Sequence, residues 1–459
     1  MSESASFSGR DPADKMPAET RMCERRKWRE ARTEPSAPSE EEMSVKQLLL
    51  RAGQRAFGLA AACAAAIVGG CLVEPSSAPP IERESEDLGE AEQALGQDGS
   101  WDSLSNLALE LFDTPGPYGF ATRDFEFVDA SRPTPPNGSY PGSPVRALPT
   151  HVFYPAQPRS LMASPPGESP VPVAPGKFPI LGYAHGLSST GNPSRFMCEF
   201  LATHGYICVA PRFPLTNAHA PGGPTFADVP NQPADLAYVM DQIPALGGAD
   251  ADLAAAVNTQ KRGILGLSMG GLTVILGAYH PTLQIPNLQA AVAEEPSACF
   301  LGAGTFERSL PVLLFGGTAD EIAVYSGVEK AFSLAPPPVT LIELIGGTHV
   351  GFLNQEVPFV DNNDTPECER LVALQTPGFG AMLGGIIDGV GPGTIDPATC
   401  GPFCADRFPQ TMGASRELKI ARAATRAHFD AALRNSPAAK AFLGQSLGGQ
   451  PDVNVHSKP

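Results

Sequence analysis

Residues 263–276 read GILGLSMGGLTVIL, with an apolar run on each side of Ser268. The central five residues match the G-x-S-x-G pattern, in which a strand turns sharply into a helix and exposes the serine hydroxyl at a sheet edge. Glycines flank such a turn because a side chain there would clash with neighbouring backbone. The pattern predicts that Ser268 is a nucleophile at the start of a helix. The alternative is a serine that only caps a helix after a tight turn.

Two further residues complete the expected chemistry, and they follow Ser268 in the order acid, then histidine. One apolar run ends in the turn GGTAD at Asp320, and the next ends in the turn GGTH at His349. If both runs are parallel strands, all three side chains reach the same sheet edge. His349 would then take the serine proton, while Asp320 would fix the imidazole tautomer and stabilise its charged form. Either residue alone would be an ordinary turn or surface residue.

Rival candidates exist for the acid and for the base. Glu294 and Glu295 also follow an apolar run downstream of Ser268, and these adjacent carboxylates could instead line the mouth of a substrate site. Asp320 is preferred as the acid. His185 is the rival base, but it precedes the nucleophile in the chain, where a histidine more often organises a loop.

An oxyanion hole requires two backbone N–H donors aimed at the developing negative charge. The residue after the nucleophile, Met269, supplies one of them. The second is expected in the loop HGLSS, which follows the apolar run Phe178–Ala184. Gly186 frees the backbone to turn there, so the N–H of Leu187 is the predicted second donor.

Apolar runs and helical periodicity alternate from about residue 101 onward, which predicts an α/β fold. Nearly continuous apolar strands indicate a mostly parallel sheet covered by helices on both faces. One domain is expected over residues 101–459, with a loop-rich insertion at 352–411 that lacks clear periodicity. Strands are predicted at Phe125–Val128, His151–Tyr154, Phe178–Ala184, Tyr206–Pro211, Gly263–Leu267, Leu288–Ala293, Leu310–Phe315 and Val339–Leu344, the first two as an antiparallel pair. Helices are predicted at Pro193–His204, Pro233–Ile243, Met269–Tyr279, Glu321–Ser333 and Ser415–Leu433, the last continuing through Pro437–Phe442.

The first hundred residues have features of export and membrane attachment, and none of catalysis. Residues 1–42 are polar without apolar periodicity, which predicts disorder, or a misassigned extension upstream of a true start at Met43. Residues 43–71 place a basic region before an Ala-rich apolar stretch that ends in VGGC, as in a lipoprotein-type signal peptide whose Cys71 becomes lipidated. The alternative is a buried N-terminal helix ending at a glycine pair. Residues 72–100, rich in Pro, Ser and Glu, predict an acidic tether.

These features place the protein outside the cytoplasm. We expect a lipoprotein anchored by Cys71 at the periplasmic face or the cell surface, or a secreted protein. The net charge of −17 argues against nucleic acid as a partner, because a phosphate-binding surface needs clustered Lys and Arg.

Six cysteines lie beyond residue 100, and an even number in an exported chain permits three disulfides of unknown connectivity. Cys368, Cys400 and Cys404 share one loop-rich region and predict at least one bridge, while Cys208 could be bridged or a free core thiol. The sequence contains no CxxC pair, so the cysteine pattern does not indicate a zinc site. The run DNND at 361–364 lacks calcium-loop spacing and is expected to be a solvated turn. Neither a metal nor a cofactor is expected.

Several short motifs resemble, in order and spacing, the family of predicted dienelactone hydrolases and platelet-activating-factor acetylhydrolases. The matching segments are Arg146–Pro149, Val152–Pro155, Tyr183–Leu187, Gly266–Gly271, Gly316–Asp320 and Gly347–Phe352. The resemblance implies an α/β-hydrolase fold, a Ser-His-Asp triad, no cofactor, and hydrolysis of short acyl esters, lactones or oxidised phospholipids. The layout is also similar to bacterial polyester-cleaving esterases. True dienelactone hydrolases have Cys in place of Ser268, and the insertion has no counterpart in the family.

The sequence therefore predicts a serine hydrolase that cleaves a carboxylic ester of a small molecule, a lipid or a polyester through an acyl-enzyme intermediate. Two other classes remain open. The same triad could serve an acyltransferase or a peptidase, because one fold hosts several reactions. The domain could also be a catalytically inactive binding protein, although such proteins usually lose a triad member or an elbow glycine.

Overall fold

The computed structural model describes residues 101–157, 171–189, 195–353, 364–374 and 411–459, with isolated positions between 386 and 408. The signal peptide, the lipidation site at Cys71 and the tether predicted for residues 1–100 lie outside the described residues, as does much of the predicted insertion. Within the described ranges, no helix is both long enough and apolar enough to cross a bilayer.

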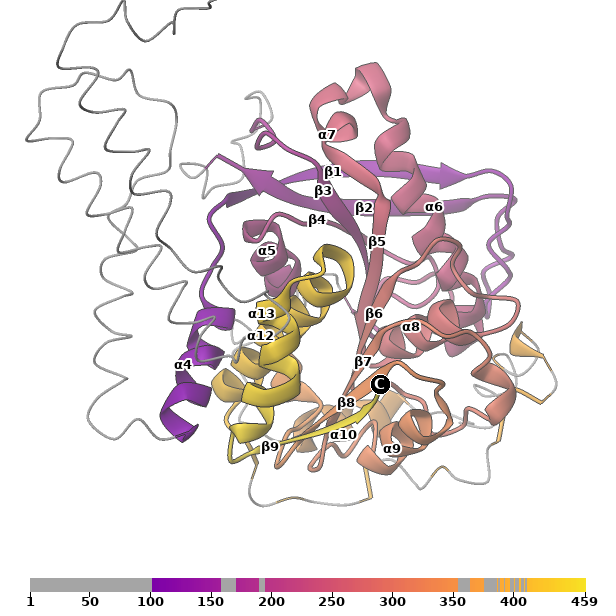
Figure 1. Ribbon diagram of the computed structural model, residues 1–459. Coiled ribbons are helices and arrows are strands. Elements are labelled where there is room, and N and C mark those ends of the chain that lie inside the picture. Colours follow the sequence, from indigo (N-terminus) through magenta and orange to yellow (C-terminus); the bar gives the residue numbers. More distant parts are fainter. Residues whose placement is uncertain are drawn as a thin grey trace, which may run out of the picture. The chain divides into compact units, whose positions relative to one another are not determined.

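A nine-stranded sheet with the order β1-β2-β4-β3-β5-β6-β7-β8-β9 forms the centre of the fold (Figure 1). Strands β4, β3 and β5 to β8 are mutually parallel, whereas β1, β2 and β9 pair antiparallel with their neighbours. This order, with helices on both faces, is that of the α/β-hydrolase fold. The strands are β1 (Gly119–Asp129), β2 (Arg146–Ala156), β3 (Phe178–Ala184), β4 (Ile207–Pro211), β5 (Val257–Leu267), β6 (Ala290–Glu294), β7 (Val312–Gly317), β8 (Val339–Leu344) and β9 (Val453–Lys458).

Helices cover both faces of the sheet, because the parallel strands are apolar on both sides. Helices α6, α8 and α9 pack into one buried cluster, and α4, α5, α12 and α13 pack into the other (Figure 1). Successive strand residues alternate between the clusters: Ile264 belongs to the first and Leu265 to the second. The helices are α4 (Trp101–Asp113), α5 (Arg195–Thr203), α6 (Gln232–Ala245), α7 (Ala251–Ala256), α8 (Met269–Tyr279), α9 (Tyr325–Leu334), α10 (Thr365–Leu374), α12 (Ala414–Arg434) and α13 (Pro437–Ala441).

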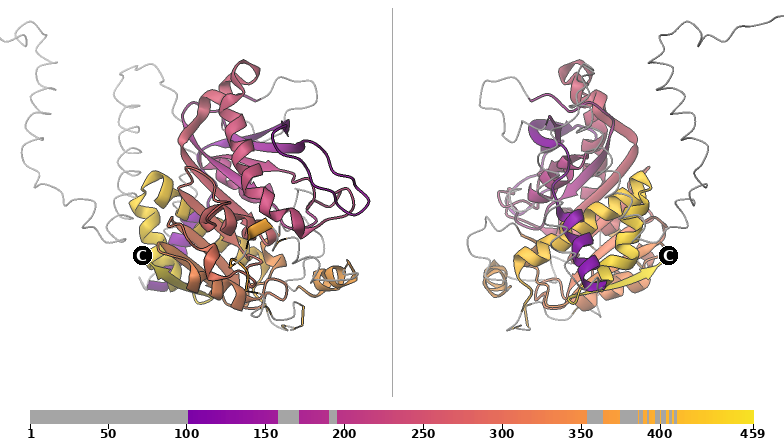
Figure 2. Two further views of the ribbon diagram at one scale, coloured as in Figure 1. Left: turned by 90° about the vertical axis from the view of Figure 1, so that its right-hand side faces the viewer. Right: turned by 60° about the vertical axis from the view of Figure 1, so that its left-hand side comes forward.

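The predicted parallel sheet and the opening antiparallel pair are confirmed, but four elements were not predicted, namely α4, α7, α10 and β9. Helix α4 lies against α12 (Figure 2), where Glu110 and Asp113 form ion pairs with Lys419 and Arg422. Strand β9 completes one sheet edge beside β8, although its sequence VNVHSK is largely polar. Helix α10 forms inside the predicted loop-rich insertion.

Helix α9 begins later than predicted, at Tyr325 instead of Glu321. The intervening residues form a turn around Asp320, whose Oδ1 accepts hydrogen bonds from the N–H groups of Ile322 and Ala323 at 2.7 Å each. The aspartate thus organises the segment that the periodicity had assigned to the helix.

Three disulfides join Cys198 to Cys208, Cys299 to Cys400 and Cys368 to Cys404. The bridge predicted within the loop-rich region is confirmed. The alternative of a free core thiol at Cys208 is wrong, because α5 brings Cys198 against β4. Among the described residues, no cluster of three or more His, Cys, Asp or Glu side chains could hold a metal ion.

Candidate active site

Ser268 lies between the last residue of β5 and the first residue of α8, with φ 61° and ψ −119°. Few non-glycine residues adopt a positive φ, and such strain is concentrated at functional sites. Its side chain makes no capping hydrogen bond to the helix, so the alternative of a capping serine is wrong. The predicted strand-to-helix elbow is confirmed.

The elbow glycines leave no room for side chains. A Cβ at Gly266 would lie 2.7 Å from the carbonyl oxygens of Ala184 and Gly270. A Cβ at Gly270 would lie only 2.0 Å from the Ala184 oxygen. The end of β3 therefore packs directly against the turn, which explains why the pattern requires glycine at these positions.

Asp320 and His349 meet as predicted, with His349 Nδ1 2.8 Å from Asp320 Oδ2. Both residues are buried, at 2% and 8% exposure. The hydrogen bond from Nδ1–H leaves Nε2 as the free nitrogen of a neutral imidazole. This is the tautomer that a proton acceptor for a serine hydroxyl requires.

The loops that carry Asp320 and His349 are in direct contact. Ala319 N donates to the carbonyl oxygen of Gly347 at 2.9 Å, and Gly346 N donates to Thr318 Oγ1 at 2.8 Å. The acid and the histidine therefore belong to one packed unit at the carboxyl ends of β7 and β8.

Strand β6 lies between β5 and β7 and links Ser268 to this unit. Ser268 N donates to the carbonyl oxygen of Glu294 at 2.8 Å, and Glu295 N donates to the Phe315 oxygen at 3.2 Å. In the part of the chain that the structure describes, no hydrogen bond joins the Ser268 hydroxyl to His349. Such contacts are often long in the absence of substrate.

The two rival acids occupy different positions. Glu294 lies beside Thr425 of α12, and burial raises the pKa of Glu294 to about 8. Its side chain therefore serves the packing of α12 and not the histidine. Glu295 instead lies against Asp320, where burial and the Asp320 charge raise the pKa of Glu295 well above its usual range.

Glu295 supports Asp320 as a neutral acid. Both Glu295 oxygens are buried and, among the described residues, have no hydrogen-bond partner. Burial favours the neutral form of this carboxyl, which then adds no second negative charge beside Asp320. Burial disfavours the charge of Asp320, but the charge and the hydrogen bond of His349, together with the Ile322 N–H, outweigh it and lower the pKa of Asp320 below its ordinary value. The Asp320 carboxylate therefore remains ionised next to the histidine.

His185, the rival base, is occupied elsewhere. Its Nδ1–H donates to the carbonyl oxygen of Gly186 at 2.8 Å, and its Nε2 accepts from Phe213 N at 3.2 Å. Burial lowers the pKa of His185 to about 4. With both nitrogens used, the residue holds the loop after β3 in place, as predicted.

That loop brings Leu187 beside the elbow, since a Cβ on the preceding Gly186 would lie 3.5 Å from Ser268 Cβ. Ser188 N and Ser189 N donate to Thr216 O and Gly186 O, whereas no acceptor is recorded for Leu187 N within the described ranges. The first helical bond of α8 runs from Leu272 N to Ser268 O, so Met269 N lies ahead of the helical ladder. The loop after β3 therefore passes next to the elbow, and the N–H groups of Leu187 and Met269 remain the predicted donors.

Two buried carboxyls beside the pair were missed at the level of sequence. Asp364 was expected in a solvated turn, but it is 1% exposed and receives backbone hydrogen bonds from the His349 loop. The rest of that run, residues 361–363, lies outside the described residues. Glu417 of α12 accepts a hydrogen bond from Thr348 N at 3.0 Å. Neither residue has a local pattern that marks it, because each acts across a long sequence separation.

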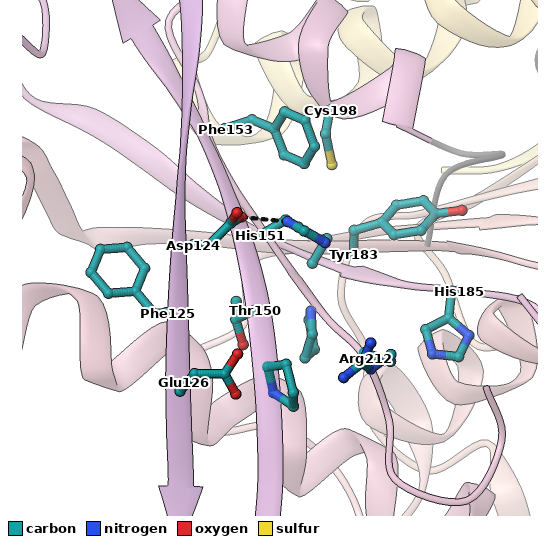
Figure 3. A pocket seen from close by; sticks show the side chains of 13 residues that line it. Asp124, Phe125, Glu126, Thr150, His151, Phe153, Tyr183, His185, Cys198 and Arg212 are labelled. Carbon is teal, nitrogen blue, oxygen red and sulfur yellow. Dashed lines mark hydrogen bonds and ion pairs between the residues drawn. The ribbon is translucent and has the colours of Figure 1, made fainter. Parts of the chain in front are cut away.

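A hollow of about 150 Å³ lies beside the loop after β3, between β1, β2, β4 and α5. Figure 3 shows the ion pair of Asp124 and His151 in it, with His185 and Arg212 to one side. Neither Ser268 nor His349 lines this hollow. The hollow therefore includes neither the predicted nucleophile nor the predicted base.

Comparisons with known proteins leave the substrate open. No protein-family model matches the chain, and no curated protein matches its sequence. Among solved structures it is similar to the ferulic acid esterase from Streptomyces cinnamoneus, with 19% sequence identity and a TM-score of 0.47. The alignment covers 74% of this chain and 96% of that one.

Proposed function

We propose that the protein is a serine hydrolase that cleaves carboxylic esters, with Ser268 as nucleophile, His349 as general base and Asp320 as the acid. The observation that carries the proposal is the Asp320–His349 hydrogen bond of 2.8 Å at the same sheet edge as the strained turn of Ser268. A reactive serine requires an adjacent base that is itself oriented by a third group.

In the proposed reaction, His349 Nε2 accepts the proton of the Ser268 hydroxyl as its oxygen attacks the ester carbonyl carbon. The N–H groups of Leu187 and Met269 stabilise the oxyanion of the tetrahedral intermediate. His349 then returns the proton to the leaving alcohol as the acyl-enzyme forms. Water, deprotonated by His349, releases the carboxylic acid and regenerates Ser268.

The same geometry is compatible with an acyltransferase or a peptidase, which differ in the group that accepts or carries the acyl chain. An inactive binding domain is less well supported, because the chain keeps both elbow glycines and the Asp320–His349 hydrogen bond. A carboxylic ester of a small molecule, a lipid or a polyester remains the proposed substrate class, and no cofactor is proposed.

A fluorophosphonate probe and a series of nitrophenyl esters of increasing acyl length test the proposal. We expect wild-type protein to be labelled and to hydrolyse at least the short esters, and Ser268→Ala to lose both properties. Ser333→Ala, at an exposed helical serine of α9, is the matched control and should behave as wild type. A folded wild-type protein that the probe does not label would overturn the proposal.

We also propose that the protein is exported and anchored to a membrane by lipid on Cys71. The signal-like stretch 43–71 supports this, as do the three disulfides, which are typical of oxidising compartments. Mass spectrometry of the native protein should find lipidated Cys71 as its first residue. Recovery of peptides from residues 1–42 in the mature protein would contradict this.

A further inference from the structure

Asp364 stands directly before α10, in a segment that the sequence presents as a loop-rich insertion. Its side chain is almost fully buried, at 1% exposure. A buried carboxylate is costly unless hydrogen bonds compensate for its lost hydration. The groups that donate hydrogen bonds to the Asp364 carboxylate therefore indicate its role.

All three donors are backbone N–H groups of the two loops that form the Asp320–His349 pair. Asp364 Oδ2 accepts from Glu321 N at 2.9 Å and from His349 N at 3.1 Å, while Oδ1 accepts from Val350 N at 2.9 Å. Glu321 directly follows the proposed acid. One carboxylate thus joins the backbone of the acid loop to the backbone of the histidine itself.

A closed ring of contacts holds Asp364 in this place. The Asp364 carbonyl oxygen accepts from Cys368 N at 2.8 Å, and Cys368 is bonded to Cys404. Cys404 N in turn donates to the carbonyl oxygen of Glu321 at 2.6 Å. The segment therefore binds both backbone groups of Glu321. Asp364 accepts a hydrogen bond from the Glu321 N–H, and the Cys404 N–H donates one to the Glu321 carbonyl oxygen.

We propose that Asp364 is a positioning residue of the hydrolase: it fixes the acid loop against the histidine loop and is itself held by the Cys368–Cys404 disulfide. This inference rests on the proposed function of Ser268, His349 and Asp320. Asp364 touches no reacting atom, so it acts through the geometry and the charge of His349.

The charge of Asp364 has a consequence that a purely structural contact would not have. Burial lowers the pKa of His349, but the charges of Asp320, Asp364 and Glu367 outweigh it and raise that pKa above its ordinary value. Burial and the nearby Asp320 charge raise the pKa of Asp364 itself to about 6, while His349 opposes this. Glu417 of α12 also interacts with Asp364 through its charge. Removing the Asp364 charge should therefore lower the pKa of His349.

The test compares full-length wild type, Asp364→Asn and Glu369→Gln. The asparagine keeps the size of the side chain but loses its charge and one acceptor. Glu369 is exposed on the same helix, so its variant removes an equal charge without touching either loop. The readouts are the rate of fluorophosphonate labelling between pH 5 and 9, and the His349 pKa from NMR of ¹⁵N-histidine-labelled protein without substrate.

For Asp364→Asn we expect labelling slowed by roughly 10- to 100-fold, the usual effect of misplacing a catalytic group by about 1 Å, together with a lower His349 pKa. Glu369→Gln should match wild type in both readouts. If Asp364→Asn does not fold, the double variant Cys368→Ala/Cys404→Ala replaces it. That variant keeps the carboxylate but opens the ring, and slowed labelling is again expected.

Two outcomes would overturn the inference and leave the hydrolase intact. One is wild-type labelling and an unchanged His349 pKa in Asp364→Asn. The other is slower labelling with an unchanged His349 pKa, which would reduce Asp364 to a structural contact. Failure of wild type to be labelled would instead overturn the proposed function, before any variant is compared.

Discussion

The carbonyl oxygen of Gly347 lies 2.4 Å from the position that a Cβ on Gly317 would occupy. Gly317 ends β7 before the acid loop, and Gly347 precedes the histidine by two residues. The two loops approach so closely only because neither residue has a side chain. The separation of Asp320 and His349 is therefore set by backbone contact as much as by their own hydrogen bond.

Replacing Gly317 with alanine should force the two loops apart. We expect a loss of about 1–3 kcal/mol in the free energy of unfolding, as for other overpacking substitutions, and a lower kcat. Urea unfolding and nitrophenyl ester hydrolysis measure the two effects. Gly413→Ala is the control, because a Cβ there meets no atom within 4 Å. Unchanged stability in Gly317→Ala would show that the loops can move apart freely.

Asp320→Asn should lower kcat by roughly 10³- to 10⁴-fold, because an amide can no longer hold the Nδ1–H tautomer of His349. The effect on KM should be small, since Asp320 is buried behind the histidine and does not face the substrate. Steady-state kinetics with a short-chain ester measure both constants. Activity retained in Asp320→Asn but lost in Glu295→Gln would assign the acid to Glu295 instead.

Glu295→Gln should remain close to wild type in activity, because the amide is neutral, like the buried acid, and has nearly the same size. Glu295→Leu leaves no polar group beside the Asp320 carboxylate, and we expect kcat to fall about tenfold, the equivalent of about 1.4 kcal/mol in activation free energy. The comparison is made by ester hydrolysis at pH 8. Equal losses in the two variants would mean that Glu295 acts through its shape alone.

Ester hydrolysis should decline at acidic pH, because only neutral His349 can accept the serine proton. Burial alone would lower the pKa of His349, but Asp320 and Asp364 raise it above its ordinary value of 6.5. The acid limb of kcat/KM should therefore lie above pH 6.5. A limb well below that pH would show that the carboxylates do not act on His349.

The same shifts predict how the pair contributes to stability. The raised pKa of His349 gives a contribution that is complete below pH 6.5 and is lost as the pH rises through the folded pKa. The lowered pKa of Asp320 gives a contribution to the stability that is complete above pH 3.8. This contribution is lost as the pH falls through the pKa of Asp320 in the folded protein. The stability difference between wild type and Asp320→Asn should be largest between these two pH values, as urea titrations at several pH values will measure.

The Cys299–Cys400 disulfide should contribute more stability than Cys198–Cys208, because it closes a longer loop. The sequence separations are 101 and 10 residues. The chain-entropy model gives upper limits of about 4–5 and about 3 kcal/mol. Unfolding of the two Cys→Ser double variants measures the difference. Equal losses would show that the unfolded chain is already compact around Cys299.

Sequence reasoning identified Ser268, Asp320 and His349 because each follows an apolar strand and ends it in a glycine turn. Parallel neighbours place their carboxyl ends at one edge, so strand order alone brought these residues together. The same reasoning left the acid open between Asp320 and Glu294 or Glu295. The carboxyls of Asp320, Glu294 and Glu295 all lie at the ends of strands of the same sheet. No local sequence pattern tells which of them faces the histidine.

What the sequence determined by itself is the elbow at Ser268, since a strained turn with no space for a Cβ permits few residue types. It also determined the parallel sheet, since strands buried on both faces must be apolar throughout. The tertiary structure decided the disulfide pairs, the neutral Glu295 behind Asp320 and the burial of Asp364. These depend on contacts between residues 10 to 101 positions apart in the sequence, and on burial that changes the charge of a carboxyl. From the sequence Asp364 is expected in a solvated turn, whereas in the structure it is buried against the backbone of the His349 loop.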